Sequence, residues 1–436
     1  MTHRPLCTLL LFLLTFYATA QDSISSNYAF VKQQVAISKY QNKPFRLSAA
    51  MRKLPNNNNE VVTLYAKLRN ETGKGAYIRD MGNRPLDANW HVYSIDGVME
   101  ADTEFIVFGL YCANNGTFFF DDFKLEVEVE KGEWETIAIK NPGFETAQEK
   151  DTPVWGSKYI GTVKQFTSAI TNKNPYRGEY CLMIEGKGVY GQNDDKGGFV
   201  TANGISFYYE TYGKGEPLLL LHGAGQSLGA FAEQIDFFSK HYKVIAVDSR
   251  GRGRSGDKVD EPFTYVEQAK DMKLLLEALK IEKAHVVGWS DGGIIGLIMA
   301  MRHPEKVNKL VAMAANINPE GVVAEHAEKT KELLREMEFK NDDKDKTDIK
   351  IYRALINHPQ LEYKDLGVIT APTLIMAGDH DLIKHSHTLQ IYEAIPNAHL
   401  AILPGESHWF PEANAKSFNT IVFTFLSEPF RAIRRF

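Results

Sequence analysis

The hydrophobic and polar positions follow two different rhythms, which change near residue 195. In residues 21–195, short runs such as 44–51, 104–112 and 117–130 alternate apolar and polar positions, and clusters of turn-forming residues separate them. A period of two with many aromatic residues is typical of antiparallel strands. We therefore expect residues 21–195 to form an antiparallel β domain.

Residues 196–436 show a longer repeat, in which apolar runs alternate with helical stretches such as 265–279. This alternation predicts an α/β fold with a mostly parallel sheet covered by helices. Residues 318–366 break the rhythm, and we expect a short cap there, with one helix and a solvated charged connection at 340–348. The expected strands lie at residues 217–223, 243–250, 284–290, 308–316, 371–379 and 398–405.

The first twenty residues differ from the rest of the chain. A basic start at His3 and Arg4 precedes a run of Leu and Phe, which ends in Ala-Thr-Ala. This pattern predicts a cleavable signal peptide over residues 1–20, with a membrane anchor as the alternative. We therefore expect a secreted or periplasmic protein with no membrane contact after cleavage.

Charge and cysteine content narrow the choice of partners and compartment. The net charge is −5, and no basic stripe of the kind that binds nucleic acid is present, so we expect no nucleic-acid partner. Two cysteines follow the signal segment, Cys112 and Cys181. They could pair in an oxidising compartment or remain buried thiols, and the sequence leaves both open.

A serine flanked by glycines follows one of the expected strands. Gly288, Ser290 and Gly292 form a G-x-S-x-G motif between an apolar run and a helical stretch. Such a turn forces the serine to a strained backbone conformation near positive φ, and it leaves no room for side chains two residues away. The motif predicts that Ser290 is a nucleophile.

A serine hydroxyl needs a base, and the base needs a carboxylate to orient it. In this architecture the groups follow in the order serine, acid, histidine. We expect Asp381 to be the acid rather than Asp379, because it lies further past its strand. We expect His408 to be the base, and the rejected candidates His380, His385 and His387 lie in a polar run that looks exposed.

An oxyanion hole needs two backbone N–H groups directed at one oxygen. The amide of Asp291 follows the nucleophile, and Ala224 lies in the glycine-containing loop after the first strand of the sheet. His222 is expected to shape that loop. Asp291, Gly223, Trp289 and Trp409 are also candidates for substrate contact.

These motifs resemble a known superfamily. Residues 200–430 are similar to the α/β-hydrolase superfamily, because its motifs are matched in order by HGAG, DSRGRGRSG, GWSDGG, GDHDLI and the final His408. The stretch 288–307 resembles the valacyclovir-hydrolase-like and related bacterial serine esterases. In that group the acid after the nucleophile, here Asp291, is associated with recognition of an amino group. The resemblance implies ester hydrolysis through an acyl-enzyme.

The sequence motifs leave the identity of the substrate open. An amine-bearing ester, or a macrocyclic lactone as in macrolide esterases, would suit the resemblance. Carbon–carbon hydrolases and perhydrolases also keep this serine, and a non-catalytic binding protein on the same fold is the third alternative. Asp291 could equally have a structural role, because an acidic side chain stabilises the N-terminus of a helix. We expect no cofactor and no metal, because no dinucleotide-binding loop opens into a helix and no metal-ligand motif is present.

Segments of the β domain have a resemblance of their own. Residues 117–128 and 141–155 look like parts of jelly-roll, carbohydrate-binding modules, although their order along the chain is reversed. The resemblance implies a glycan partner, whereas the reversed order leaves a role in packing against the second domain equally open. Trp90, Trp134 and Trp155 are candidate stacking platforms or core residues.

Overall fold

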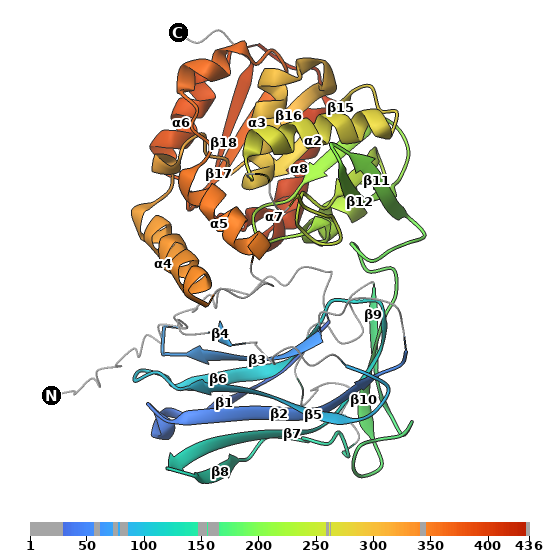
Figure 1. Cartoon of the computed structure of the whole chain (residues 1–436), viewed down its shortest axis with the longest axis vertical. Helices are drawn as coiled ribbons and strands as arrows, with labels where there is room; N and C mark the ends of the chain where they lie inside the picture. The colour runs from blue at the N-terminus through green and yellow to red at the C-terminus, as the bar shows by residue number, and fades with distance from the viewer. Residues whose placement is uncertain are drawn as a thin grey trace, which may run out of the picture.

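The structure is a computed structural model in which a β domain and an α/β domain follow one another along the chain (Figure 1). It describes residues 29–55, 62–72, 77–78, 86–146, 155, 165–258, 261, 263–340 and 346–432. The predicted signal peptide at 1–20 lies outside these described residues, so its cleavage and the secretion of the protein stay predictions. Among the described helices, none is both long and apolar enough to cross a membrane.

Two antiparallel sheets form the β domain. The first has the order β1 (Ala29–Ala36), β6 (Phe105–Cys112), β3 (Val62–Arg69) and β4 (Tyr77–Ile78). The second has the order β5 (His91–Val98), β2 (Pro44–Lys53), β7 (Gly116–Glu130), β10 (Cys181–Gly186) and β9 (Phe166–Thr171), with β8 (Glu133–Ile137) paired to β7. Alternate apolar residues of both sheets, such as Leu64 and Phe108 on one and Phe45 and Leu125 on the other, share one core. The alternation of apolar and polar residues with a period of two is therefore that of a β-sandwich.

The cysteines and one tryptophan belong to the interior of this domain. Cys112 and Cys181 are both buried and both free thiols. Burial raises the pKa of Cys112 to about 12 and that of Cys181 to about 11, so neither is a reactive thiolate near neutral pH. Trp155 is fully buried and stacks on Phe144, whereas Trp90 and Trp134 are only partly buried.

The sheet of the second domain is parallel except for the hairpin at one edge. Its order is β11 (Gly197–Ala202), β12 (Ile205–Tyr212), β14 (Lys243–Val247), β13 (Pro217–Leu221), β15 (Ala284–Trp289), β16 (Val307–Met313), β17 (Thr373–His380) and β18 (Ala398–Ser407). The strands β11 and β12 pair antiparallel, and β12 pairs antiparallel with β14. From β14 onward the paired strands are parallel, as the sequence predicts.

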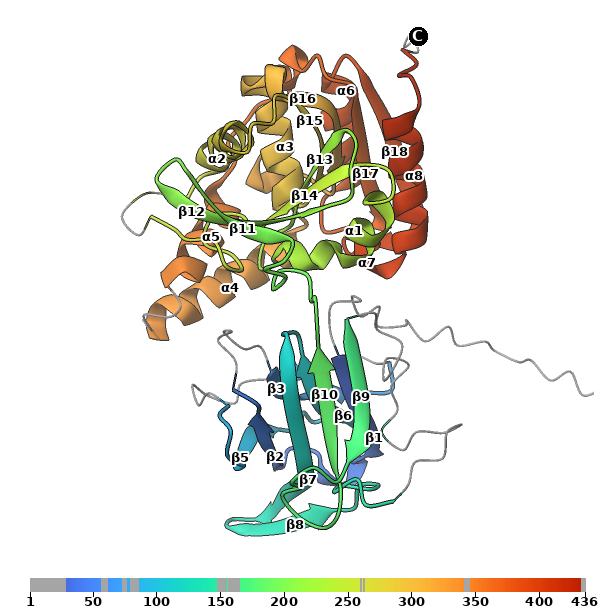
Figure 2. The same ribbon diagram turned by 90° about the vertical axis from the view of Figure 1, so that its right-hand side faces the viewer.

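Helices cover both faces of this sheet (Figure 2). Leu219 and Leu221 of β13 belong to a core with α2 (Tyr265–Ala278), α3 (Asp291–Arg302) and α6 (His385–Ala394). Leu218 and Leu220 belong to the core on the other face, with α1 (Ala232–Phe238) and α8 (Ala415–Ser427). A strand buried on both faces needs apolar residues at every position, which explains the continuous leucine run.

The described residues of the cap include two α-helices, α4 (Ala324–Lys340) and α5 (Lys346–Asn357). The expectation of a charged connection through residue 348 is therefore wrong at its end, because α5 begins at Lys346. Residues 341–345 lie outside the described part. Ile351 and Ala354 of α5 pack against Phe263 in a small apolar cluster, so this helix is anchored to the domain beneath it.

Residues 187–196, called the connecting segment below, join the two domains. Val189 is buried in the core of the β domain, and the next residue, Tyr190, is buried in a core of the second domain. The two cores therefore separate between Val189 and Tyr190, which is before the expected domain boundary between residues 195 and 196.

Candidate functional site

The turn between β15 and α3 consists of Ser290 alone. Its backbone has φ 54° and ψ −116°, so the predicted strain at positive φ is confirmed. A Cβ added at Gly292 would lie 1.9 Å from the carbonyl oxygen of Leu221, and one at Gly288 would lie 2.1 Å from the carbonyl oxygen of Gly292. Glycine is therefore required at both positions, for the reason that the sequence motif suggests.

Asp381 and His408 meet at the ends of the next strands of the sheet. Nδ1 of His408 lies 2.8 Å from Oδ1 of Asp381, whose side chain is fully buried. The same carboxylate oxygen accepts a hydrogen bond from the backbone N–H of Ile383 at 3.0 Å. Asp379 is directed elsewhere, since its side chain is partly exposed and lies 3.9 Å from His380. An imidazole held by a carboxylate at Nδ1 leaves Nε2 to accept a proton.

The two tryptophans hold the histidine loop against the serine loop. Trp289 is buried, and its indole N–H donates to the carbonyl oxygen of His408 at 2.9 Å. Trp409 meets the Trp289 ring edge-on at 5.5 Å and is about half exposed. Neither ring lines the cavity described below. Because Trp289 directly precedes Ser290, its hydrogen bond to the His408 carbonyl links the serine turn to the histidine loop.

The loop after β13 lies directly against the serine. A Cβ at Gly223 would lie 3.2 Å from Cβ of Ser290, so glycine permits this approach. His222 shapes the loop, because its Nδ1 lies 2.8 Å from the carbonyl oxygen of Gly223 and its Nε2 accepts the N–H of Ser249 at 3.0 Å. Burial lowers the pKa of His222 to about 4, so the ring is neutral and Nδ1 carries the proton. Ala224 follows in this loop and does not line the cavity.

A cavity of about 490 Å³ lies between the cap and the carboxyl end of the sheet. Its wall combines apolar groups with several ionisable ones. The side of the sheet contributes Tyr265, Ser290, Asp291, Asn316 and His408, together with Leu382, Ile383 and Lys384 from a neighbouring loop. The cap contributes Pro319, Glu320, Val322, Ala324, His326, Ala327, Glu328, Thr330, Lys331, Leu355 and Ile356.

Asp291 is the most buried acid of the cavity wall, and it directly follows the serine. It is the first residue of α3, where backbone N–H groups have no partner within the helix. The hydroxyl of Tyr265 donates to its Oδ1 at 2.8 Å, and both residues are buried. Burial raises the pKa of Asp291 to about 6, against the opposing effects of Tyr265, Arg252 and His408. Sequence reasoning missed Tyr265, because no motif marks a tyrosine that begins a helix elsewhere in the chain.

One rejected histidine has a structural role. The sequence suggests that His387 is exposed, and this is wrong, because the residue is buried. Its Nε2 accepts the N–H of Ile317 at 3.0 Å, and its Nδ1 lies 2.6 Å from the hydroxyl of Tyr363. His387 thereby fixes the loop that leads from β16 into the cap. No group of three or more His, Cys, Asp or Glu side chains within the described ranges is arranged to hold a metal ion.

Comparison with known proteins agrees with this architecture. A family model described as the alpha/beta hydrolase fold matches residues 216–336. The chain is 30% identical over 249 residues to the serine hydrolase BPHL of Mus musculus, and the match covers 52% of this chain and 85% of that protein. The chain belongs to the α/β-hydrolase superfamily. It is therefore a hydrolase of the α/β-hydrolase kind.

Two further proteins are similar to this chain and have different names. A 2-hydroxy-6-oxo-6-phenylhexa-2,4-dienoate hydrolase of Burkholderia cepacia is 28% identical over 273 residues, with 52% of this chain and 96% of that protein covered. A solved enol-lactonase of Burkholderia xenovorans LB400 is similar at 23% identity and a TM-score of 0.44, covering 53% of this chain and all of that one.

Proposed function

We propose that this α/β-hydrolase cleaves carboxylic esters through an acyl-enzyme on Ser290. His408 takes the hydroxyl proton as Oγ of Ser290 bonds to the ester carbonyl carbon, and it then gives that proton to the departing alcohol. Water repeats the sequence on the acyl-enzyme, which releases the acid and restores the serine hydroxyl. The hydrogen bond between His408 and the buried Asp381, at the wall of a cavity shared with Ser290, carries this proposal.

The negative charge that develops on the carbonyl oxygen needs donors. The backbone N–H groups of Asp291 and Ala224 are the proposed oxyanion hole. The N–H of Asp291 is the first of α3, and the positive end of the helix dipole there also favours an anion. The close approach of the Gly223 loop to Ser290 supports the choice of Ala224 as the second donor.

The substrate that we propose carries a basic nitrogen. A buried carboxylate is unfavourable without a partner, and the Tyr265 hydroxyl is a neutral one. A substrate ammonium group beside Asp291 would supply a charge-assisted hydrogen bond. An α-amino acid ester fits this description, and so does an amino-sugar-bearing macrolide lactone. The cavity of about 490 Å³ is within the range of small-molecule sites, about 300–1,000 Å³.

The test replaces Asp291 with Asn, which keeps the backbone donor and removes the charge. The substrates are L-valine ethyl ester and its isostere, in which a methyl group replaces the ammonium group. We expect kcat/KM to fall for the valine ester and to hold for the isostere. Equal losses on both esters would reduce Asp291 to a helix-terminal acid and would contradict the amine-bearing substrate.

Carbon–carbon bond hydrolysis is the second candidate, because the relative from Burkholderia cepacia is named for a dienoate substrate. The two activities separate in a direct assay. Cleavage of a 2-hydroxy-6-oxo-dienoate faster than of L-valine ethyl ester and its isostere would favour this candidate. Rapid release of ethanol from esters, with no loss of the dienoate chromophore, would exclude it.

A further inference from the structure

A largely buried arginine joins the loop after β14 to the cap. Arg252 follows β14, and its side chain is 14% exposed. Its Nη1 lies 2.5 Å from Oδ1 of Asp348 on α5, which is about half exposed. Gly251 beside it has φ 66°, and a Cβ there would lie 2.6 Å from Cγ2 of Thr347. The loop after β14 and the start of α5 are therefore in direct contact.

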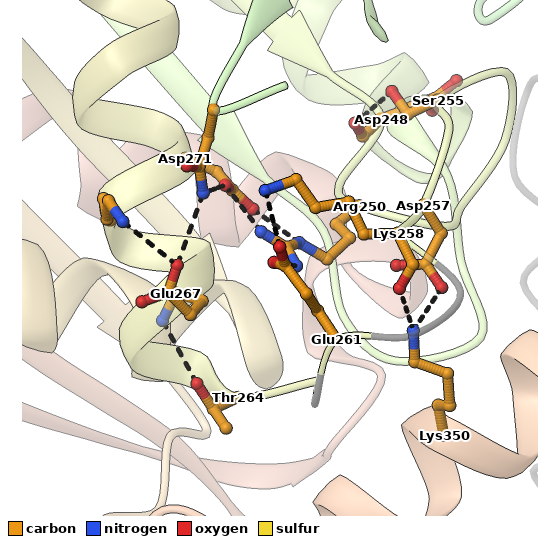
Figure 3. A network of polar contacts seen from close by, with 12 residues as sticks. Asp248, Arg250, Ser255, Asp257, Lys258, Glu261, Thr264, Glu267, Asp271 and Lys350 are labelled. Atoms are coloured by element: carbon orange, nitrogen blue, oxygen red, sulfur yellow. Dashed lines mark hydrogen bonds and ion pairs between the residues drawn. The ribbon is translucent and has the colours of Figure 1, made fainter. Parts of the chain in front are cut away.

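A second ion pair joins the same loop to the same helix. Nζ of Lys350 lies 2.7 Å from Oδ2 of Asp257 and donates to the carbonyl oxygen of Lys258, also at 2.7 Å (Figure 3). Both pairs dock α5, whose Leu355 lines the cavity together with Asp291. The Lys350 pair therefore supplies a matched control, because it serves the same docking without involving Arg252.

The charge of Arg252 reaches the cavity although its side chain does not line it. It favours the ionised form of Asp291, and it adds to the effect of burial in lowering the pKa of His222. The other groups that act on Asp291 are the Tyr265 hydroxyl from α2 and His408 after β18. The remaining ionisable groups of the cavity wall are Glu320, His326, Glu328, Lys331 and Lys384.

We propose that Arg252 and Asp348 are positioning residues that set the charge presented to the substrate beside Asp291. Asp348 binds the guanidinium of Arg252 from the cap side, so the protein's own cation does not pair with Asp291. The Asp291 carboxylate is thereby left for the ammonium group of the substrate. This inference rests on the proposed amine-bearing substrate, and it adds that the cap helix α5 controls the strength of that recognition.

The two halves of the pair should act in opposite directions. Asp348→Asn leaves the Arg252 charge uncompensated, which stabilises the Asp291 carboxylate and repels an ammonium group. Arg252→Gln removes a cation that favours the carboxylate, so Asp291 protonates at higher pH. A loss of docking alone would move both variants in the same direction, and it would affect charged and neutral esters alike.

The experiment measures kcat/KM for L-valine ethyl ester divided by kcat/KM for its methyl isostere, between about pH 5 and 7. The α-ammonium group stays protonated there, since its pKa is about 7.7–8.0. Both esters need His408 as the base, so any pH dependence of catalysis that the two esters share cancels in this ratio. This ratio should fall at low pH as Asp291 takes up a proton, and that fall is the acid limb. We expect the acid limb to shift to lower pH in Asp348→Asn and to higher pH in Arg252→Gln, each by about 0.2–0.7 pH unit. In Asp348→Asn, KM for the valine ester should also rise near neutral pH while kcat holds.

Lys350→Met should leave the ratio at its wild-type pH dependence, and melting temperatures verify that all three variants fold. Shifts of one sign in both Arg252→Gln and Asp348→Asn, or an equal shift in Lys350→Met, would overturn the inference. If Asp291→Asn is selective for the valine ester but neither half of the pair moves the acid limb, the inference fails alone. If Asp291→Asn is not selective, the amine-bearing substrate fails, and the inference fails with it.

Discussion

The connecting segment should be part of the folding unit of the hydrolase domain. We compare two fragments that both lack the β domain, residues 187–436 and residues 198–436. Only the longer one keeps Tyr190, which is 5% exposed, meets the ring of Tyr212 edge-on at 5.2 Å and donates its hydroxyl to Asp236. Removing a buried aromatic side chain of this kind costs about 3–5 kcal/mol.

The shorter fragment also lacks one of the donors to a buried carboxylate. Glu210 is fully buried, and its Oε1 accepts the backbone N–H of Asn193 at 2.7 Å. The hydroxyls of Tyr208 and Tyr212 also donate to it, each at 2.8 Å. Loss of one partner of a buried group costs about 1–3 kcal/mol. Together the losses reach about 4–8 kcal/mol, which is comparable with the whole stability of a domain, about 5–15 kcal/mol.

The assay is thermal unfolding of both fragments, followed by circular dichroism. At about 2–4 °C per kcal/mol, the shorter fragment should melt at least ~8 °C lower, or be insoluble. As a control, Asp194→Ala in the longer fragment breaks only the exposed pair with Arg254 and should cost less than about 1 kcal/mol. Melting temperatures of the two fragments within about 3 °C of each other would refute the reasoning.

Three further predictions concern the site. Gly292→Ala should lower kcat more than about 100-fold, because its Cβ would meet the carbonyl oxygen of Leu221 at 1.9 Å and displace the turn; a normal rate would contradict the turn's role. Asp381→Asn should lower kcat by about 10⁴-fold, and Asp379→Asn should change it little, so the reverse order would move the acid to Asp379. The preference for amine-bearing esters should be greatest at about pH 7, where Asp291 is ionised and the α-ammonium group is protonated, and it should be lost as the pH falls through about 6, because burial raises the pKa of Asp291 to about that value; a preference constant down to about pH 4 would contradict this.

The strands and the nucleophile turn follow from local sequence. The leucine run 217–221 is apolar at every position because both faces of β13 are covered, and this pattern is visible without the structure. Gly288 and Gly292 are equally local signals, since each avoids a clash within the same strand–turn–helix unit or with the neighbouring strand. Such features need only a period and a turn chemistry to be predicted.

The features that sequence reasoning missed depend on contacts between distant segments. Tyr265 reaches Asp291 only because α2 packs against α3, and nothing near either residue in the sequence indicates this. His387 lies in a polar run but is buried by the loop from β16. The charged residues at 346–350 begin a helix because Asp348 and Lys350 find partners on the loop after β14. In each case tertiary packing overrides the local pattern.

The central claim is that Ser290 is the nucleophile, and active-site labelling tests it most directly. The full chain is treated with a fluorophosphonate, and the modified peptide is identified by mass spectrometry. We expect one adduct, on Ser290, and complete loss of ester hydrolysis as the adduct forms. Ser290→Ala should keep the wild-type melting temperature, remain unlabelled and lose activity by about 10⁴-fold or more. An adduct on another residue, or near-normal ester hydrolysis by Ser290→Ala, would contradict the account.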